Sequence, residues 1–173
     1  SALARTKPDG TVVRTLWGEL AWQLGGSEAY GLTADADARG VSPGERLVRE
    51  LLVRYGPALI LVDEWLPFAR QIYGKSDPPA GSFGANLTFM HFLTKAIRHT
   101  LSAMLVVVLP VSQREIGGQD GEYALGAVEH LFARSAKKWQ PAGGDECIQI
   151  VRQRLFEPLT DPAAAAARDA VVD

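Results

Sequence analysis

The chain has 173 residues, of which 47% are hydrophobic and 22% are charged, and its formal net charge is -2. These values are ordinary for one soluble globular domain, with or without a tail, and they give no global basic field for binding nucleic acid. A single cysteine, Cys147, excludes an internal disulfide and fits a reducing compartment. The N-terminus lacks a signal-peptide core, and no apolar run approaches the ~20 residues of a membrane span. We therefore expect a cytoplasmic protein without a membrane partner.

Helices are predicted where apolar residues recur at helical spacing between capping residues. Residues 1–10 predict irregular chain that ends in a tight turn. Thr15 is expected to cap the first helix, and Gly25-Gly26 to end it. Ser42–Glu45 predicts a capping box, whereas residues 27–41 show no clear period. The expected helices are 16–24, 43–55, 65–73, 86–100, 120–134 and 145–156.

Two continuous apolar runs predict buried strands. They are Ala58–Val62 and Ala103–Leu109. An unbroken apolar run of this length is typical of a strand that is buried on both faces in a parallel sheet. Each run follows a predicted helix, so the leading fold class is α/β, with a mainly parallel sheet flanked by helices.

Two adjacent carboxylates, Asp63 and Glu64, follow the first apolar run. In parallel sheets ligands bind beyond the carboxyl ends of the strands, so this pair is expected at the site-forming edge. Apolar residues followed by Asp-Glu form the Walker B pattern of nucleotide triphosphatases. There the Asp holds Mg²⁺ and the Glu polarises the attacking water. The alternative is an ordinary strand followed by a helix, because acids favour helix N-termini.

A phosphate loop is not found in this sequence. The triplet Gly74-Lys75-Ser76 needs a glycine five positions before Gly74, and that residue is Ala69. The triplet also follows a predicted helix, whereas a phosphate loop follows a strand, so residues 74–85 are predicted to be a loop. The chain opens on Ser-Ala-Leu without an initiator Met. We expect it to be a piece of a longer protein.

Two further residues have positions that suit phosphoryl transfer, which depends on positioning and charge stabilisation. Ser112 lies just past the second apolar run, where a polar residue senses the γ-phosphate. Arg134 lies at the end of a predicted helix, where a cation can act as an arginine finger. The alternatives are a helix cap for Ser112 and a solvated helix-end cation for Arg134.

Other chemistries have little support in the sequence. His91, His99 and His130 lie far apart along the chain, and the one cysteine has no partner at ligand spacing. His91 is expected to be a partly buried histidine. No G-x-S-x-G elbow is present for serine-hydrolase chemistry. Asp63 is therefore the one predicted metal ligand.

Several blocks of the sequence closely resemble a family of large prokaryotic AAA-type P-loop ATPases long labelled as of unknown function. Members of that family are similar to the PglY-like ATPases of phage-resistance clusters (BREX and phage growth limitation), and others accompany DNA methyltransferases. The resemblance covers about residues 9–158. The blocks that carry it are Arg14–Gly26 (RTLWGELAWQLGG), Leu61–Trp65 (LVDEW), Pro79–Phe83 (PAGSF), Asn86–Phe89 (NLTF) and Arg152–Pro158.

This resemblance implies Asp63 for Mg²⁺, Glu64 as catalytic base, Ser112 as sensor and Arg134 as a finger or sensor arginine. It implies a partial AAA-type P-loop NTPase core at residues 15–158, with a lead-in at 1–14 and a tail at 159–173. The family's phosphate loop lies upstream of the Leu-Trp-Gly block and is absent here. We therefore expect these 173 residues alone to bind ATP weakly or not at all.

Three functions remain open at this point. The first is an ATPase motor or switch whose site is completed by upstream sequence and by a neighbouring subunit, with DNA or DNA-modification proteins as partners of the full-length chain. The second is a non-catalytic α/β scaffold or interaction domain. The third is a nucleic-acid-binding module that uses arginines in one of two groups. These groups are Arg46, Arg49 and Arg54, and Arg152 and Arg154.

Overall fold

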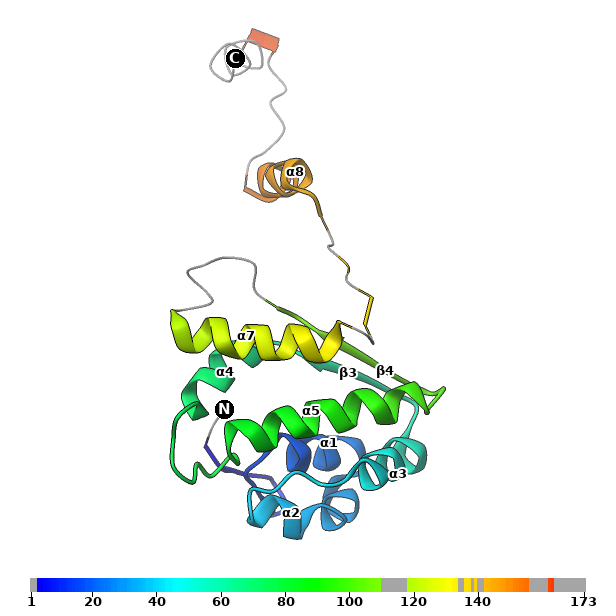
Figure 1. Ribbon diagram of the computed structural model, residues 1–173. Helices are drawn as coiled ribbons and strands as arrows, with labels where there is room; N and C mark the ends of the chain where they lie inside the picture. The colour runs from blue at the N-terminus through cyan, green and yellow to red at the C-terminus, as the bar shows by residue number, and fades with distance from the viewer. Residues whose placement is uncertain are drawn as a thin grey trace. The chain divides into compact units, whose positions relative to one another are not determined.

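The chain divides into two compact units. A computed structural model describes residues 3–109, 118–133, 136, 137, 139, 142–155, 162 and 163. Unit 1 is Ser1–Ala136 and unit 2 is Lys137–Asp173. Unit 1 contains both sheets and most of the helices (Figure 1). The domain bounds expected at residues 14 and 158 stay predictions.

The N-terminal segment is a small hairpin and not irregular chain. Strands β1 (Arg5–Thr6) and β2 (Val12–Val13) pair antiparallel. The turn between them is closed by a hydrogen bond from the Gly10 N–H to the Lys7 carbonyl at 2.9 Å. Gly10 has φ 85°, a left-handed conformation in which glycine is the least strained residue. The tight turn expected here is confirmed.

Helix α1 (Leu16–Gly31) begins as predicted, since the Thr15 side chain accepts a hydrogen bond from the Gly18 N–H. The helical geometry breaks at Gly25-Gly26, as expected, but a second helical segment follows directly. The two glycines leave helical geometry, with φ -153° and φ 61°, and the helix kinks and continues. A Cβ on Gly25 would lie 2.4 Å from the Tyr55 ring, so close packing of helix on ring requires glycine here.

Helices α2 (Ala34–Ala38) and α3 (Glu45–Tyr55) follow. The polar stretch 27–41 is thus largely helical, although its sequence shows no period. The predicted capping box is also wrong. Helix α3 begins after Gly44 without a side-chain cap, and the Ser42 hydroxyl instead donates to the Pro43 carbonyl.

Strands β3 (Ala58–Val62) and β4 (Ala103–Val107) form the second sheet. They pair parallel and in register, with Ala58 opposite Ala103 and Val62 opposite Val107. The α/β class and the pairing of the two apolar runs are confirmed. Helices α4 (Trp65–Ile72) and α5 (Phe83–Arg98) lie between these strands in the chain.

Only one face of the β3–β4 sheet is buried, so the expectation of burial on both faces is wrong for the residues described. Ile60 packs into the main core, whereas the neighbouring Leu59 and Leu61 are 62% and 68% exposed. Met104, opposite Leu59, is 61% exposed. Alternate residues of a strand point to opposite faces, so these side chains form one open apolar face.

Helix α5 runs through unit 1 between α3 and α7 (Gln119–Phe132) (Figure 1). It contributes much of the main core, whose buried members are Trp17, Val48, Leu52, Ile60, Trp65, Leu66, Ala69, Phe89, Met90, Leu93, Ala96, Ala124 and Val128. Unit 2 contains α8 (Gly144–Leu155), close to the predicted bounds. In the described part of the chain no helix is both long and apolar enough to span a bilayer.

Candidate functional site

Asp63 and Glu64 lie between the carboxyl end of β3 and the first turn of α4, as the sequence predicts. Both side chains are exposed. The Glu64 N–H donates to Oδ1 of Asp63 at 2.9 Å. The parallel ladder continues beside them, because the Val108 N–H donates to the Val62 carbonyl at 2.9 Å. The acid pair is therefore at the edge of the sheet where parallel strands end.

The backbone of Glu64 has an uncommon conformation. Its φ is 52° and its ψ is 30°, in the left-handed region. For a residue with a side chain this geometry costs roughly 1–2 kcal/mol, and such outliers cluster at functional sites. Glu64 is the N-cap position of α4 but makes no capping hydrogen bond. The ordinary interpretation, in which the acids favour the helix N-terminus, explains their place but not this conformation.

The donor set at this edge fits a magnesium–nucleotide site better than a metal held by protein alone. Among the described residues no group of three or more His, Cys, Asp or Glu side chains is close enough to hold a metal. Mg²⁺ in nucleotide sites keeps several waters and uses one or two carboxylates with the phosphates of the substrate. Asp63 is suited to that role because its second oxygen is not used by the Glu64 N–H.

No contact among the described residues brings the other predicted site residues to this edge. Ser112 and Arg134 lie outside the described residues. Gly74-Lys75-Ser76 is loop after helix α4, as predicted, and the Lys75 N–H donates to the Ile72 carbonyl at 3.3 Å.

Two histidines that are far apart in the sequence line one groove. His91 of α5 and His130 of α7 border a mostly apolar hollow of about 370 Å³. His91 is exposed, so its expected partial burial is wrong. The groove holds two imidazoles, and no third metal-ligating side chain joins them among the described residues.

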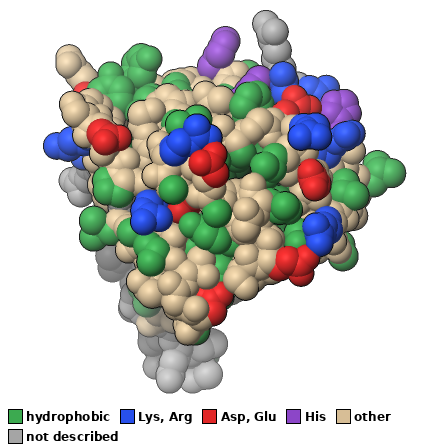
Figure 2. Space-filling view, turned by 90° about the horizontal axis from the view of Figure 1, so that it is seen from below, with side chains coloured by type: hydrophobic (Ala, Val, Ile, Leu, Met, Phe, Trp, Pro, Cys, Tyr) green, Lys and Arg blue, Asp and Glu red, His purple; other side chains and the backbone are tan. Residues whose placement is uncertain are grey.

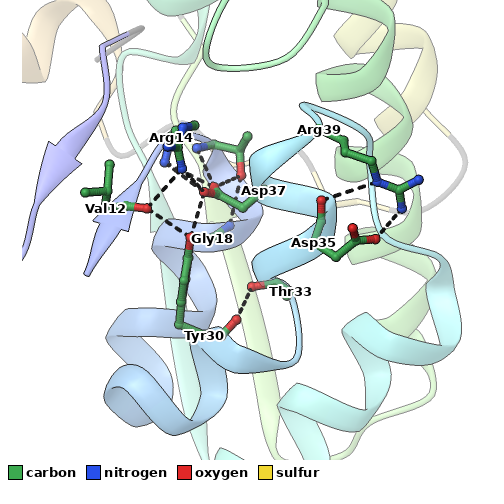
Figure 3. A network of polar contacts seen from close by, with 9 residues as sticks. Val12, Arg14, Gly18, Tyr30, Thr33, Asp35, Asp37 and Arg39 are labelled. Atoms are coloured by element: carbon green, nitrogen blue, oxygen red, sulfur yellow. Dashed lines mark hydrogen bonds and ion pairs between the residues drawn. The ribbon is translucent and has the colours of Figure 1, made fainter. Parts of the chain in front are cut away.

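A buried carboxylate that the sequence did not indicate organises the N-terminal region. Asp37 of α2 is fully buried and accepts hydrogen bonds from the backbone N–H groups of Arg14 and Thr15 (Figure 3). The Tyr30 hydroxyl lies 2.9 Å from Oδ2 of Asp37 and 2.9 Å from the Val12 carbonyl oxygen. Burial, and then the hydrogen bond to Asp37, raise the pKa of Tyr30 to about 12. This network joins the hairpin to α1 and α2.

A second contact fixes the hairpin turn on α1. The Lys7 ammonium lies 2.7 Å from Oε1 of Glu19 and 4.4 Å from the centre of the Trp22 ring. Burial alone would raise the pKa of Glu19, but hydrogen bonds from Lys7 and Gln23 outweigh it, so that pKa is lowered. Both networks are structural, since neither reaches the acid pair.

Blocks that are separate in the sequence meet around α5. The buried Asn86 amide donates to three carbonyls of the preceding loop, those of Ala80, Gly81 and Ser82. A Cβ on Gly81, which has φ 78°, would lie 2.9 Å from the Trp17 ring. The Trp65 and Phe83 rings have centroids 6.2 Å apart. Packing of the core therefore accounts for much of the pattern in these blocks.

A family model, the DUF499 N-terminal domain, matches residues 4–137 of the chain. The match includes the acid pair and ends beside the boundary between the two units. The chain belongs to the DUF499 N-terminal domain family. No curated protein and no solved structure matches the chain. The expected relationship of this DUF499 domain to AAA-type and PglY-like ATPases stays a prediction.

Proposed function

We propose that this DUF499 domain contributes the Walker B half of an ATP-hydrolysing site. Asp63 binds Mg²⁺, and Glu64 is the base that polarises the attacking water. The observation that carries the proposal is the exposed acid pair at the carboxyl end of a parallel strand, with Glu64 in a left-handed conformation. A strand–turn–helix of this kind holds a carboxylate outside the sheet edge, where ligands of open parallel sheets bind.

Binding of ATP by this site needs a phosphate-binding loop, which these 173 residues lack. In the proposal that loop comes from other sequence of the same protein or from a neighbouring subunit of a homo-oligomer. Mg²⁺ would supply charge neutralisation at the phosphates. Ser112 as γ-phosphate sensor and Arg134 as finger remain part of the proposal. The resemblance to PglY-like ATPases supports the further proposal of a role in phage defence or DNA modification.

A thermal-shift measurement tests the proposal. A longer protein that contains this domain with its phosphate loop is heated with and without Mg²⁺-ATP. Saturation at 100 times Kd stabilises a protein by about 2.7 kcal/mol, so a clear rise in Tm is expected. Asp63→Asn should remove the part of the shift that requires Mg²⁺. An unchanged Tm in the unmodified protein would count against the proposal, and the 173-residue chain alone should show no shift that requires Mg²⁺.

The second candidate is an interaction domain without catalysis, and the open apolar face of the β3–β4 sheet favours it. Large contiguous patches of exposed apolar side chains often mark surfaces that bind other proteins. Leu59, Leu61 and Met104 are each more than half exposed on that face. This candidate predicts no protection by Mg²⁺-ATP in the same measurement.

Nucleic-acid binding through the arginines of α3 is not favoured. Arg54 pairs with Glu28, and Glu45 of α3 pairs with Lys95. Figure 2, in which the molecule of Figure 1 is seen from below, shows acidic and basic side chains interspersed on that face. A surface of mixed sign gives little counterion release, which is the main source of sequence-independent affinity for nucleic acid.

A further inference from the structure

Helices α4 and α7 border an open hollow on the surface of unit 1. The two helices lie side by side (Figure 1). The hollow has a volume of about 680 Å³ and is open to solvent. Pro67, Arg70 and Gln71 of α4 line one side, and Gln119 and Asp120 from the first turn of α7 line the other.

The polar side chains of this hollow have unused hydrogen-bonding capacity. Within the described ranges, none of the four makes a hydrogen bond or an ion pair with another residue. The Arg70 guanidinium donates only and the Asp120 carboxylate accepts only, whereas the two glutamine amides do both. One cation and one anion also leave the hollow without net charge. Its chemistry is therefore that of a site for a neutral, polar ligand with both donors and acceptors.

An aromatic cluster with one exposed ring, that of Tyr123, lies close to the hollow. Tyr123 follows Gln119 by four residues on α7, so the two share a helix face, and Tyr73 directly follows the end of α4. The Tyr73 and Tyr123 ring centroids are 5.4 Å apart across the two helices, and Phe83 completes the cluster. Tyr123 is 59% exposed. A large aromatic ring is thus presented to solvent beside free polar groups.

We propose that this surface, the α4–α7 hollow with Tyr123 at its border, binds a nucleobase. The flat ring of the base stacks on Tyr123, and its polar edge forms hydrogen bonds with the Gln71 and Gln119 amides. Arg70 donates to an acceptor of the base, and Asp120 accepts from a donor. A phosphate has no ring to stack on Tyr123, and the hollow offers it no net positive charge. The proposal concerns a site separate from Asp63 and Glu64 and does not rest on the ATPase function.

The base can belong to a free nucleoside or to single-stranded nucleic acid, and binding measurements on the 173-residue chain distinguish these sources. Adenosine and thymidine are titrated by calorimetry, and labelled single-stranded oligodeoxyadenylate by fluorescence anisotropy. Stacking on an aromatic side chain contributes about 1–3 kcal/mol per base, so Tyr123→Ala should weaken binding about tenfold. Tyr123→Phe keeps the ring and should bind within about twofold of the unmodified chain.

Arg70→Ala should also weaken binding, whereas Arg98→Ala, an exposed arginine on α5, serves as the matched control and should not. Binding of a nucleoside or of the oligonucleotide supports the proposal if Tyr123→Ala weakens that binding. Which of the two ligands binds shows whether the base belongs to a free nucleoside or to single-stranded nucleic acid. Absence of binding at millimolar ligand overturns it. So does binding that Tyr123→Ala leaves unchanged and that falls steeply with salt, because that behaviour belongs to phosphate contacts elsewhere. Gln119→Ala repeats the test if Tyr123→Ala fails to fold.

Discussion

The carboxylate of Asp37 accepts two hydrogen bonds from Thr15, at 2.8 Å from the backbone N–H and at 2.6 Å from the hydroxyl. Thr15 in turn caps α1, so Asp37 holds the residue that starts the helix. Removal of one partner from a buried charged network costs about 3–5 kcal/mol. Asp37→Ala should therefore lower the free energy of unfolding by about that amount, as measured by urea denaturation.

The neighbouring Asp35 provides the control for that prediction. It lies on the same short helix but is exposed, and it pairs with Arg39 one turn away. Exposed pairs of this kind are worth about 0.3–0.5 kcal/mol, so Asp35→Ala should have little effect. Equal losses for the two variants would contradict the structural role of Asp37.

Gly18 is predicted to be intolerant of a side chain. A Cβ there would lie 2.3 Å from Oδ1 of Asp37. The Asp37 side chain is fully buried, so it cannot move away. Gly18→Ala should destabilise the chain by about 1–3 kcal/mol, the usual cost of overpacking. Gly126 of α7 is exposed and has open space around it, so Gly126→Ala should stabilise by about 0.5–1 kcal/mol. Differential scanning calorimetry of both variants shows whether the signs are opposite.

The stability of the domain should depend on Tyr30 at alkaline pH. Its pKa is about 12 in the folded state against 10.0 for the free side chain. The unfolded chain therefore loses this proton first, and the stabilisation by neutral Tyr30 is complete below pH 10 and lost as the pH rises toward 12. Tyr30→Phe should show a smaller fall in Tm between neutral pH and that range. An identical fall in the variant and the parent would contradict the shifted pKa.

The two faces of β3 should respond differently to truncation. Ile60→Ala removes a core side chain and should cost about 2–4 kcal/mol. Leu61→Ala removes an exposed side chain and should cost less than about 1 kcal/mol. Chemical denaturation of both variants measures the difference. A large cost for Leu61→Ala in this chain would show that the outer face is buried in solution.

Much of the fold was predictable because its signals are local. The Thr15 cap, the helix that ends at Tyr55 and the two apolar strands each depend on residues close in sequence, and each is confirmed. The acid pair was predictable for the same reason, since apolar residues followed by Asp-Glu place it at a strand end.

The remaining features depend on contacts between distant residues. Asp37 has no recognisable local pattern, because its partners Arg14 and Thr15 lie 23 and 22 residues away. Gly25-Gly26 indicates a break in the helix, but not the second helical segment that follows it or the Tyr55 ring that packs against Gly25. A continuous apolar strand does not show which of its faces is covered, so the open side of β3 cannot be predicted from its sequence. The α4–α7 hollow combines residues of two helices that no sequence motif connects.

The steady-state ATPase rate of a Glu64→Gln variant, made in a longer protein that includes the phosphate loop, tests the central claim most directly. The amide keeps the size of the side chain but cannot take a proton from water, so hydrolysis should fall by about 100-fold or more, the usual range for loss of a general base. Binding of Mg²⁺-ATP, followed by thermal shift, should be retained. An unchanged hydrolysis rate would contradict the assignment of Asp63 and Glu64 as the Walker B half of the site.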